Sequence, residues 1–183
     1  DRISLNRFES QEVVLNAFAI FRQTGNEISI QPGSYDFGET QIGFNTAGQR
    51  EFSGGVNYRT GDFFNGERVN INGSFTWNQS RNFSMSLRYD WNDIELPQGD
   101  FTTRLSSVNS QVAFSPNLYW ISLIQYDNIS EEIGINTRLQ WVPRAGQEAF
   151  IVLNHNMQDF DQDNRFDTAF SELSLKFRYT FRF

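Results

Sequence analysis

The last segment of the chain has the most regular pattern of apolar and polar positions. From Glu172 to Phe183 the two kinds of residue alternate without a break. Successive side chains of a β-strand point to opposite faces, so this pattern predicts a strand with one apolar and one polar face. The apolar set is Leu173, Leu175, Phe177, Tyr179, Phe181 and Phe183; the polar set is Glu172, Ser174, Lys176, Arg178, Thr180 and Arg182.

The same alternation recurs through the rest of the chain. It is regular over residues 68–77, 83–92 and 133–141, shorter at 42–44 and 52–58, and mixed over 101–114, 118–126 and 149–157. The segment 101–114 changes phase near Ser107, as a β-bulge would cause. In total we expect about eight strands from Tyr35 to Phe183 and two more within Ile3–Ile30. The Phe, Ile and Val content of Val13–Phe21 favours a strand over a short helix.

Turn signals of two lengths separate these segments. Short connections are predicted at Thr46–Gln49, Asn78–Arg81, Ser115–Asn117 and Pro143–Gly146, and longer ones at Gly61–Gly66, Asp93–Asp100 and Gln158–Thr168. The connection Asp127–Ser130 is short where the order predicts a long one. An antiparallel sheet with short turns at one end and longer loops at the other is typical of outer-membrane barrels.

The chemistry of the two faces favours a membrane. Aromatic residues lie near the ends of the apolar faces, as in the interfacial girdles of outer-membrane barrels: Trp77, Trp91, Trp141, Tyr89 and Tyr179. The polar faces carry Arg and Lys, which suits a hydrated lumen. About 9–11 tilted residues span a bilayer, and closure leaves no unpaired backbone edge in lipid. We therefore predict an all-β, antiparallel transmembrane β-barrel in the bacterial outer membrane; the alternative is a soluble sandwich or soluble barrel.

This assignment predicts which residues meet lipid and which meet the lumen. The lipid-facing set is Leu173, Leu175, Phe177, Tyr179, Phe181, Phe183, Trp77 and Trp141. The lumen-facing set is Arg88, Arg138, Lys176, Arg178, Arg182 and Glu172, with Arg104 also expected to point inward and Asp90 and Glu148 as partners for the cations. The closing Tyr179, Phe181 and Phe183 resemble the signal read by the outer-membrane assembly machinery, which becomes an expected partner besides the lipid bilayer.

Composition excludes several other kinds of protein. The 183 residues contain no cysteine and one histidine, His155, which excludes disulfides, thiolate sites and two-histidine metal sites. A net charge of −7 argues against nucleic-acid binding. No apolar run approaches the roughly 20 residues of a membrane helix. Residues Asp1–Ser4 lack the apolar region of a signal peptide, so we expect a mature chain or the C-terminal part of a longer one.

One loop offers a candidate metal site. Asp159, Asp161 and Asp163 alternate like the start of a calcium-binding loop, and carboxylate oxygens are the ligands that Ca²⁺ prefers. Asn164 replaces the usual Gly, and Phe170 stands at the twelfth position in place of Glu. The alternative is a solvated acidic loop. No other cofactor is expected.

No catalytic pair is visible. Asp93, Glu95 and Asp100 lie in one turn-rich stretch without opposed faces, so they favour a structural turn over acid–base catalysis on a sugar. We therefore expect no enzyme activity.

Several stretches resemble a known bacterial family. The longest is Tyr89–Leu105, YDWNDIELPQGDFTTRL; others are Pro32–Phe37, Thr60–Gly66, Phe114–Leu118, Ile124–Asn128 and Tyr179–Phe183. Longer members of this family carry an N-terminal family-nine-type carbohydrate-binding module followed by an outer-membrane barrel of unassigned function. The resemblance, which begins near Glu27, implies an outer-membrane address and a barrel that extends further N-terminally; the binding module is not in this sequence.

Together these observations predict one barrel domain, residues 1–183, or the C-terminal part of a larger barrel. The expected function is a non-enzymatic pore, surface anchor or subunit of an envelope complex, with other envelope proteins or glycans as further partners. The alternatives are a substrate-specific glycan channel, if the chain is part of a longer one, and a soluble β-sandwich binding module. Strand number matters here, because eight strands enclose a lumen filled by side chains and sixteen leave a channel.

Overall fold

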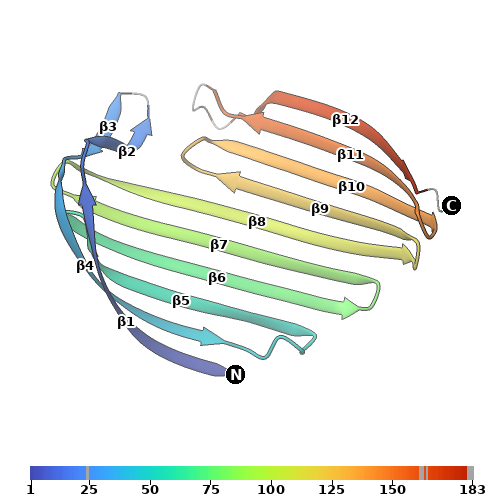
Figure 1. The fold of residues 1–183 in the computed structure, drawn as a ribbon, viewed down its shortest axis with the longest axis horizontal. Coiled ribbons are helices and arrows are strands. Elements are labelled where there is room, and N and C mark those ends of the chain that lie inside the picture. Colours follow the sequence, from blue (N-terminus) through green and yellow to red (C-terminus); the bar gives the residue numbers. More distant parts are fainter. Residues whose placement is uncertain (24, 161–162, 164, 181–183) are drawn as a thin grey trace. The chain divides into compact units, whose positions relative to one another are not determined.

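The described part of the protein is built from β-strands (Figure 1). The computed structural model describes residues 1–23, 25–160, 163 and 165–180. Ten strands form one antiparallel sheet in the order β1-β4-β5-β6-β7-β8-β9-β10-β11-β12, and β2 pairs with β3 in a separate hairpin. The strands are β1 (Arg2–Val14), β2 (Phe18–Gln23), β3 (Asn26–Ile30), β4 (Gly33–Asn45), β5 (Phe52–Phe63), β6 (Gly66–Ser80), β7 (Phe83–Leu96), β8 (Gly99–Ser115), β9 (Leu118–Asp127), β10 (Glu132–Arg144), β11 (Gln147–Gln158) and β12 (Asp167–Tyr179).

The predicted all-β, antiparallel fold is confirmed, and so is the preference for strand over helix at Val13–Phe21, where β1 ends and β2 begins. Two predicted long connections are wrong. β5 continues to Phe63 and β6 begins at Gly66, while β7 continues to Leu96 and β8 begins at Gly99. The polar residues taken for loops are extended strand, because the ladder continues past the point where the apolar pattern stops. Among the described residues, nine strands follow Gln31, where about eight were expected, and three precede it, where two were expected.

The chain forms two compact units that are described separately. Unit 1 contains Asp1–Ala47, Gly54–Gly73 and Tyr89–Arg104; unit 2 contains Gly48–Ser53, Ser74–Arg88 and Leu105–Phe183. Across the parts of the chain that the structure describes, no helix is long and apolar enough to cross a membrane.

The register in unit 1 defines two faces of its sheet. Leu5 of β1 is opposite Ile42 of β4, which is opposite Tyr58 of β5. We call this side the Ile42 face. The neighbouring positions Gln41 and Arg59 are also paired and point to the other side, with Glu39 two residues along β4. We call that side the Glu39 face.

The β2–β3 hairpin contributes to a small apolar core in unit 1. Ile28 and Ile30 of β3 are fully buried, and Phe21 of β2 stacks on Phe101 of β8 with ring centroids 4.7 Å apart. The remaining members are Val14, Ile94 and Leu96. We call these seven residues the hairpin core. Because Ile94 and Leu96 follow Asp90 and Asn92 at alternate positions of β7, this core lies on the Glu39 face.

Unit 2 has an equally clear register. Leu175 of β12 is opposite Ile151 of β11, which is opposite Leu139 of β10, and Leu139 is opposite Trp120 of β9. We call this side the Leu175 face and the opposite side the Lys176 face. The β8–β9 ladder runs without a shift from Leu105 to Ala113, and its irregularity lies between Ala113 and Ser115. The bulge predicted near Ser107 is therefore not in this ladder.

The phase change that suggested the bulge has another cause. Phe101, near the start of β8, is an apolar residue on the polar side of its strand. It belongs to the hairpin core, where Phe21 stacks on it. The strand continues in register while the chemistry of its two sides changes.

Candidate functional site

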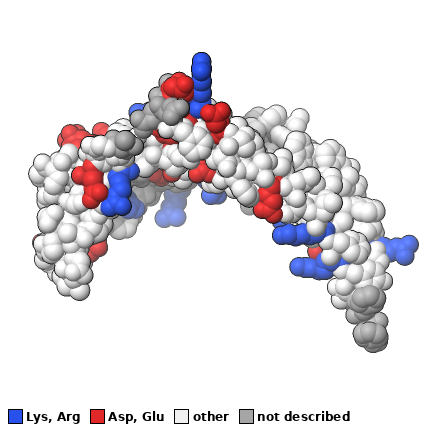
Figure 2. All heavy atoms as spheres, turned by 90° about the horizontal axis from the view of Figure 1, so that it is seen from above, with Lys and Arg blue, Asp and Glu red and all other residues white. Residues whose placement is uncertain are grey.

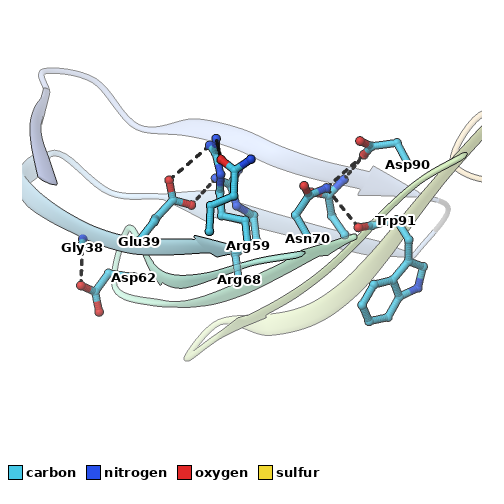
Figure 3. A network of polar contacts seen from close by, with 10 residues as sticks. Gly38, Glu39, Arg59, Asp62, Arg68, Asn70, Asp90 and Trp91 are labelled. Carbon is cyan, nitrogen blue, oxygen red and sulfur yellow. Dashed lines mark hydrogen bonds and ion pairs between the residues drawn. The ribbon is translucent and has the colours of Figure 1, made fainter. Parts of the chain in front are cut away.

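Glu39 is the centre of an ion-pair cluster on the Glu39 face (Figure 3). Its carboxylate lies 3.6 Å from an Arg59 Nη1 and accepts a hydrogen bond from Arg68 Nη2. Glu39 is only 8% exposed. The guanidinium groups also lie over aromatic rings, Arg59 over Phe8 at 4.9 Å and Arg68 over Phe63 at 4.7 Å. Pairing and ring contact compensate for the partial loss of water around these charges.

Asp90 is the centre of a second cluster, built from amides. Its carboxylate accepts hydrogen bonds from Asn70 Nδ2 at 3.3 Å, Asn72 Nδ2 at 2.9 Å and Asn92 Nδ2 at 2.8 Å. Asn70 also donates to the Trp91 carbonyl at 3.2 Å, as Figure 3 shows. These side chains come from alternate positions of β6 and β7, so the period of the strands brings them together.

Gln41 and Asn57 belong to the same polar surface. Arg59 Nη2 donates to Gln41 Oε1 at 2.9 Å, and Gln41 Nε2 donates to Asn57 Oδ1 at 3.2 Å. A pocket of about 290 Å³ opens here, lined by Gln41, Asn57, Arg59, Asn70, Asn72 and Asp90. We call it the polar groove.

The polarity of the two faces of unit 1 reverses along the strands. β7 shows it most simply, because Tyr89 and Trp91 on one side give way to Asp93 and Glu95, while Asp90 and Asn92 on the other give way to Ile94 and Leu96. Ile94 and Leu96 are buried and Glu95 is exposed. The side with Tyr89 and Trp91 therefore changes from apolar to polar along one strand, and the side with Asp90 and Asn92 changes from polar to apolar.

β1, β4 and β5 show the same reversal. On the Ile42 face the exposed apolar residues Ile3, Leu5, Ile42, Phe44, Val56 and Tyr58 are followed along the same strands by Arg7, Glu9, Gln11, Thr40, Asp36 and Thr60. The exposed Val13 lies beyond these polar positions, near the end of β1. On the Glu39 face the polar groove is followed by Tyr35, Phe37 and Phe63, with ring contacts from Phe37 to Phe63 and Phe64. An exposed apolar band thus ends at one level in unit 1.

Unit 2 exposes a broad apolar surface on the Leu175 face. Leu173, Leu175 and Phe177 are 67%, 76% and 70% exposed, and Tyr179, Trp141, Ile151 and Trp120 are also exposed. Figure 2 shows one side of the molecule with Lys and Arg in blue and Asp and Glu in red, and most of the atoms visible there belong to other residues. Of the predicted lipid-facing residues, all those in β10 and β12 that the structure describes lie on the Leu175 face, while Phe181 and Phe183 lie outside the described residues.

Trp77, the remaining member of that set, belongs to an aromatic cluster in unit 2. Phe52 stacks against Phe75 and Trp77 with centroids 6.1 and 6.0 Å apart, and Trp77 contacts Phe83 edge to face. Trp77 Nε1 donates to Glu51 Oε1 at 3.3 Å. This cluster lies next to the β4–β5 and β6–β7 connections, so its rings sit at strand ends.

Among the described residues of the predicted lumen-facing set, Arg178 forms one of the expected ion pairs. Arg178 pairs with Glu148 at 3.4 Å, whereas Glu172 accepts a hydrogen bond from Ser174. Arg138 lies over the Phe150 ring at 5.9 Å. Lys176 and Arg88 are exposed, and Arg182 lies outside the described residues.

Arg104 does not lie on the same face as its expected partner Asp90. Asn92 Nδ2 donates to Thr103 Oγ1 at 3.0 Å, which places Thr103 on the Glu39 face. Arg104 is the next residue of the same strand, so it points to the opposite side.

The acidic loop after β11 is partly described. Asp159 Oδ1 accepts from the Asp163 backbone N–H at 3.2 Å, and Asp163 Oδ1 accepts from that of Arg165 at 2.9 Å. Asp161 lies outside the described residues. Among the residues that are described, no group of three or more acidic or histidine side chains is arranged to hold a metal ion. The calcium site stays a prediction. His155 lies on the Leu175 face opposite Ile135 and Ser171.

Comparison with known proteins adds two weak structural likenesses. No protein-family profile matches the chain, and no curated protein matches it. A KdgM porin solved in complex with disordered oligogalacturonate is similar with a TM-score of 0.41 and 11% identity, over 97% of this chain and 92% of that one. A NanC porin is similar with a TM-score of 0.40 and 10% identity, over 98% and 94%. Both TM-scores are low.

Proposed function

We propose that the protein is an integral outer-membrane β-barrel without enzyme activity, with lipid on its apolar faces and a polar interior. The observation that carries this is the exposure of Leu173, Leu175 and Phe177 at alternate positions of one strand. Such a row has no protein partner in the chain as described. Large contiguous apolar surfaces on water-soluble proteins are rare, and hydrocarbon is the solvent that makes one favourable.

The aromatic side chains support the same arrangement. Phe52, Phe75, Trp77 and Phe83 cluster at strand ends, and Trp77 has a carboxylate partner beside the turn. Trp141 of β10 lies directly opposite Ala149 of β11, near the end of the β10–β11 ladder. Amphipathic rings favour the boundary between lipid and water, where one edge can be solvated.

The reversal of polarity supports a membrane boundary in unit 1. On the side of the reversal that contains Asp90, apolar side chains face outward and the polar groove faces inward. On the side that contains Ile94 and Leu96, acidic and amide side chains face outward and the hairpin core faces inward. A strand in water packs its apolar side inward, and a strand in lipid does the opposite. We infer that β7 leaves the bilayer between Trp91 and Asp93.

The proposal implies the partners that the sequence predicts, the bilayer and the assembly machinery that would read the C-terminal strand. Within it, the protein acts as an anchor, a pore or a subunit of an envelope complex. A polar inner surface such as the one around Glu39 and Asp90 suits water and small polar solutes.

Membrane fractionation of cells that express the chain behind a signal peptide tests the proposal. The expected result is a protein that sediments with outer membranes, resists urea and carbonate extraction, and dissolves only with detergent. Its mobility on unheated gels should differ from that of the boiled protein. A purified chain that stays monodisperse and folded without detergent would overturn the proposal.

A further inference from the structure

The polar groove of unit 1 has an unusual lining. Its six side chains are amides, one guanidinium and one carboxylate: Gln41, Asn57, Arg59, Asn70, Asn72 and Asp90. Ligand sites in proteins are mostly apolar with a few polar groups. A groove lined wholly by polar side chains can desolvate only a molecule that carries hydrogen-bonding groups over most of its surface.

The groove and its surroundings are electrically balanced. The Arg59 charge is paired with Glu39 at 3.6 Å, and Arg68 is paired with the same carboxylate. The Asp90 carboxylate is held by three amide donors. Two guanidiniums and two carboxylates thus lie in this region, so neither an anionic nor a cationic solute has an electrostatic advantage.

The lining side chains are also held in place. Asn70 and Asn72 are fixed by Asp90, and Asn57 is fixed by Gln41, which is itself bound by Arg59. Amides donate from nitrogen and accept at oxygen, so a row of them matches a ligand whose groups do both. Hydroxyl groups have that property. Fixed partners lower the entropic cost of binding.

The hairpin core lies on the same face as the groove, further along β7. Asp90 and Asn92 are followed on the same side of β7 by the buried Ile94 and Leu96, and Asn92 contacts Thr103, two residues from the buried Phe101. The groove's volume of about 290 Å³ is at the small end of ligand pockets, which span roughly 300–1,000 Å³.

We propose that the polar groove binds a neutral, hydroxyl-rich solute of the size of a mono- or disaccharide. The inference rests on the proposed function, because the Glu39 face must be the interior. It names the ligand class for that interior, and it does not require the protein to conduct.

Saturation-transfer NMR on the full chain in detergent micelles tests this. The probes are a panel of neutral sugars (glucose, galactose, mannose, maltose and sucrose) and one anionic disaccharide, digalacturonate. At least one neutral sugar should receive saturation and digalacturonate should not. Asn72→Ala removes one lining amide and should weaken the apparent affinity about tenfold or more. The matched control, Asn109→Ala on β8 of unit 2, should leave it unchanged.

A charge variant sharpens the result. Asp90→Asn keeps the shape of the side chain but leaves the region with an excess positive charge, so digalacturonate should now bind. The inference is overturned if no neutral sugar binds, if wild type prefers digalacturonate, or if Asn72→Ala and Asn109→Ala behave alike. Correct folding of each variant is checked by its mobility on unheated gels. Membrane fractionation of the same variants reports separately on insertion, so failure of the proposed function is distinguishable from failure of binding.

Discussion

Leu175 of β12 lies directly opposite Ile151 of β11, and both side chains are exposed, by 76% and 45%. The next pair on the same face, Phe177 and Ala149, continues the row toward the end of the sheet at which β10 connects to β11. On the other face of the same two strands, Arg178 pairs with Glu148 and Glu172 with Ser174. One ladder therefore separates an apolar from a polar environment, and this separation can be tested by charge insertion.

Leu175→Arg should destabilise the folded protein in lipid by roughly 2–4 kcal/mol, because a guanidinium in the middle of the exposed apolar row Leu173–Phe177 meets hydrocarbon. Urea titrations of folding into liposomes, followed by gel mobility, measure the change. Ser174→Arg on the Lys176 face is the matched control and should be much milder. Equal losses for the two variants would show that the faces are assigned wrongly.

The Glu39 cluster predicts a second stability effect. Glu39→Gln leaves Arg59 and Arg68 without their shared carboxylate in a poorly hydrated place, and should cost roughly 1–3 kcal/mol. Glu9→Gln removes a carboxylate that lies 3.7 Å from Arg7, where the two side chains are 79% and 61% exposed, and should change stability by less than about 0.5 kcal/mol. The same folding titration compares the two. A Glu39→Gln protein as stable as wild type would mean that the cluster is fully hydrated.

The period of two residues made the faces of the strands predictable. Glu172–Tyr179 and the segments 68–77 and 83–92 each divide into an apolar and a polar side in the structure as in the sequence, because strand geometry leaves no other choice. Where the apolar and polar sides of a strand exchange, the two-residue pattern is interrupted, and the strand was predicted to end there. The segment with Asp93, Glu95 and Asp100 was predicted to be a loop. Its apolar residues, Ile94, Leu96 and Phe101, lie on the face opposite the apolar residues that precede them in β7.

The contents of the site could not be predicted in the same way. Glu39, Arg59 and Arg68 come from three neighbouring strands, β4, β5 and β6. Only the order and pairing of these strands bring the three side chains together. No local pattern marks Glu39 as the partner of two arginines. The hairpin between β1 and β4 could not be predicted either, because β1 pairs with β4 through residues far apart in the sequence, from Val14 with Gly33 to Arg2 with Asn45.

The hairpin core predicts a local effect. Phe21→Ala removes a buried ring that stacks on Phe101, and such losses cost roughly 3–5 kcal/mol. The hairpin should then separate from the sheet, and trypsin should cut after Arg22, whose side chain is already 73% exposed. The ten-stranded sheet should keep its gel mobility. Phe18→Ala, which truncates a ring that is 41% exposed, should give slower cleavage. Cleavage of Phe21→Ala at the wild-type rate would argue against a stabilising role for this core.

The reversal along β7 predicts where the strand leaves the bilayer. The chain contains no cysteine, so single cysteines can be introduced without background. Leu87 and Glu95 occupy positions of the same parity on β7, but the first lies within the apolar row and the second beyond it. In proteoliposomes opened to reagent on both sides, a charged maleimide should label Glu95→Cys quickly and Leu87→Cys slowly, because lipid shields the latter. In detergent with urea the two rates should converge, which controls for intrinsic reactivity. Equal labelling of both sites in the folded, membrane-embedded protein would mean that lipid does not cover this side of the strand at Leu87, and the boundary between Trp91 and Asp93 would have to be abandoned.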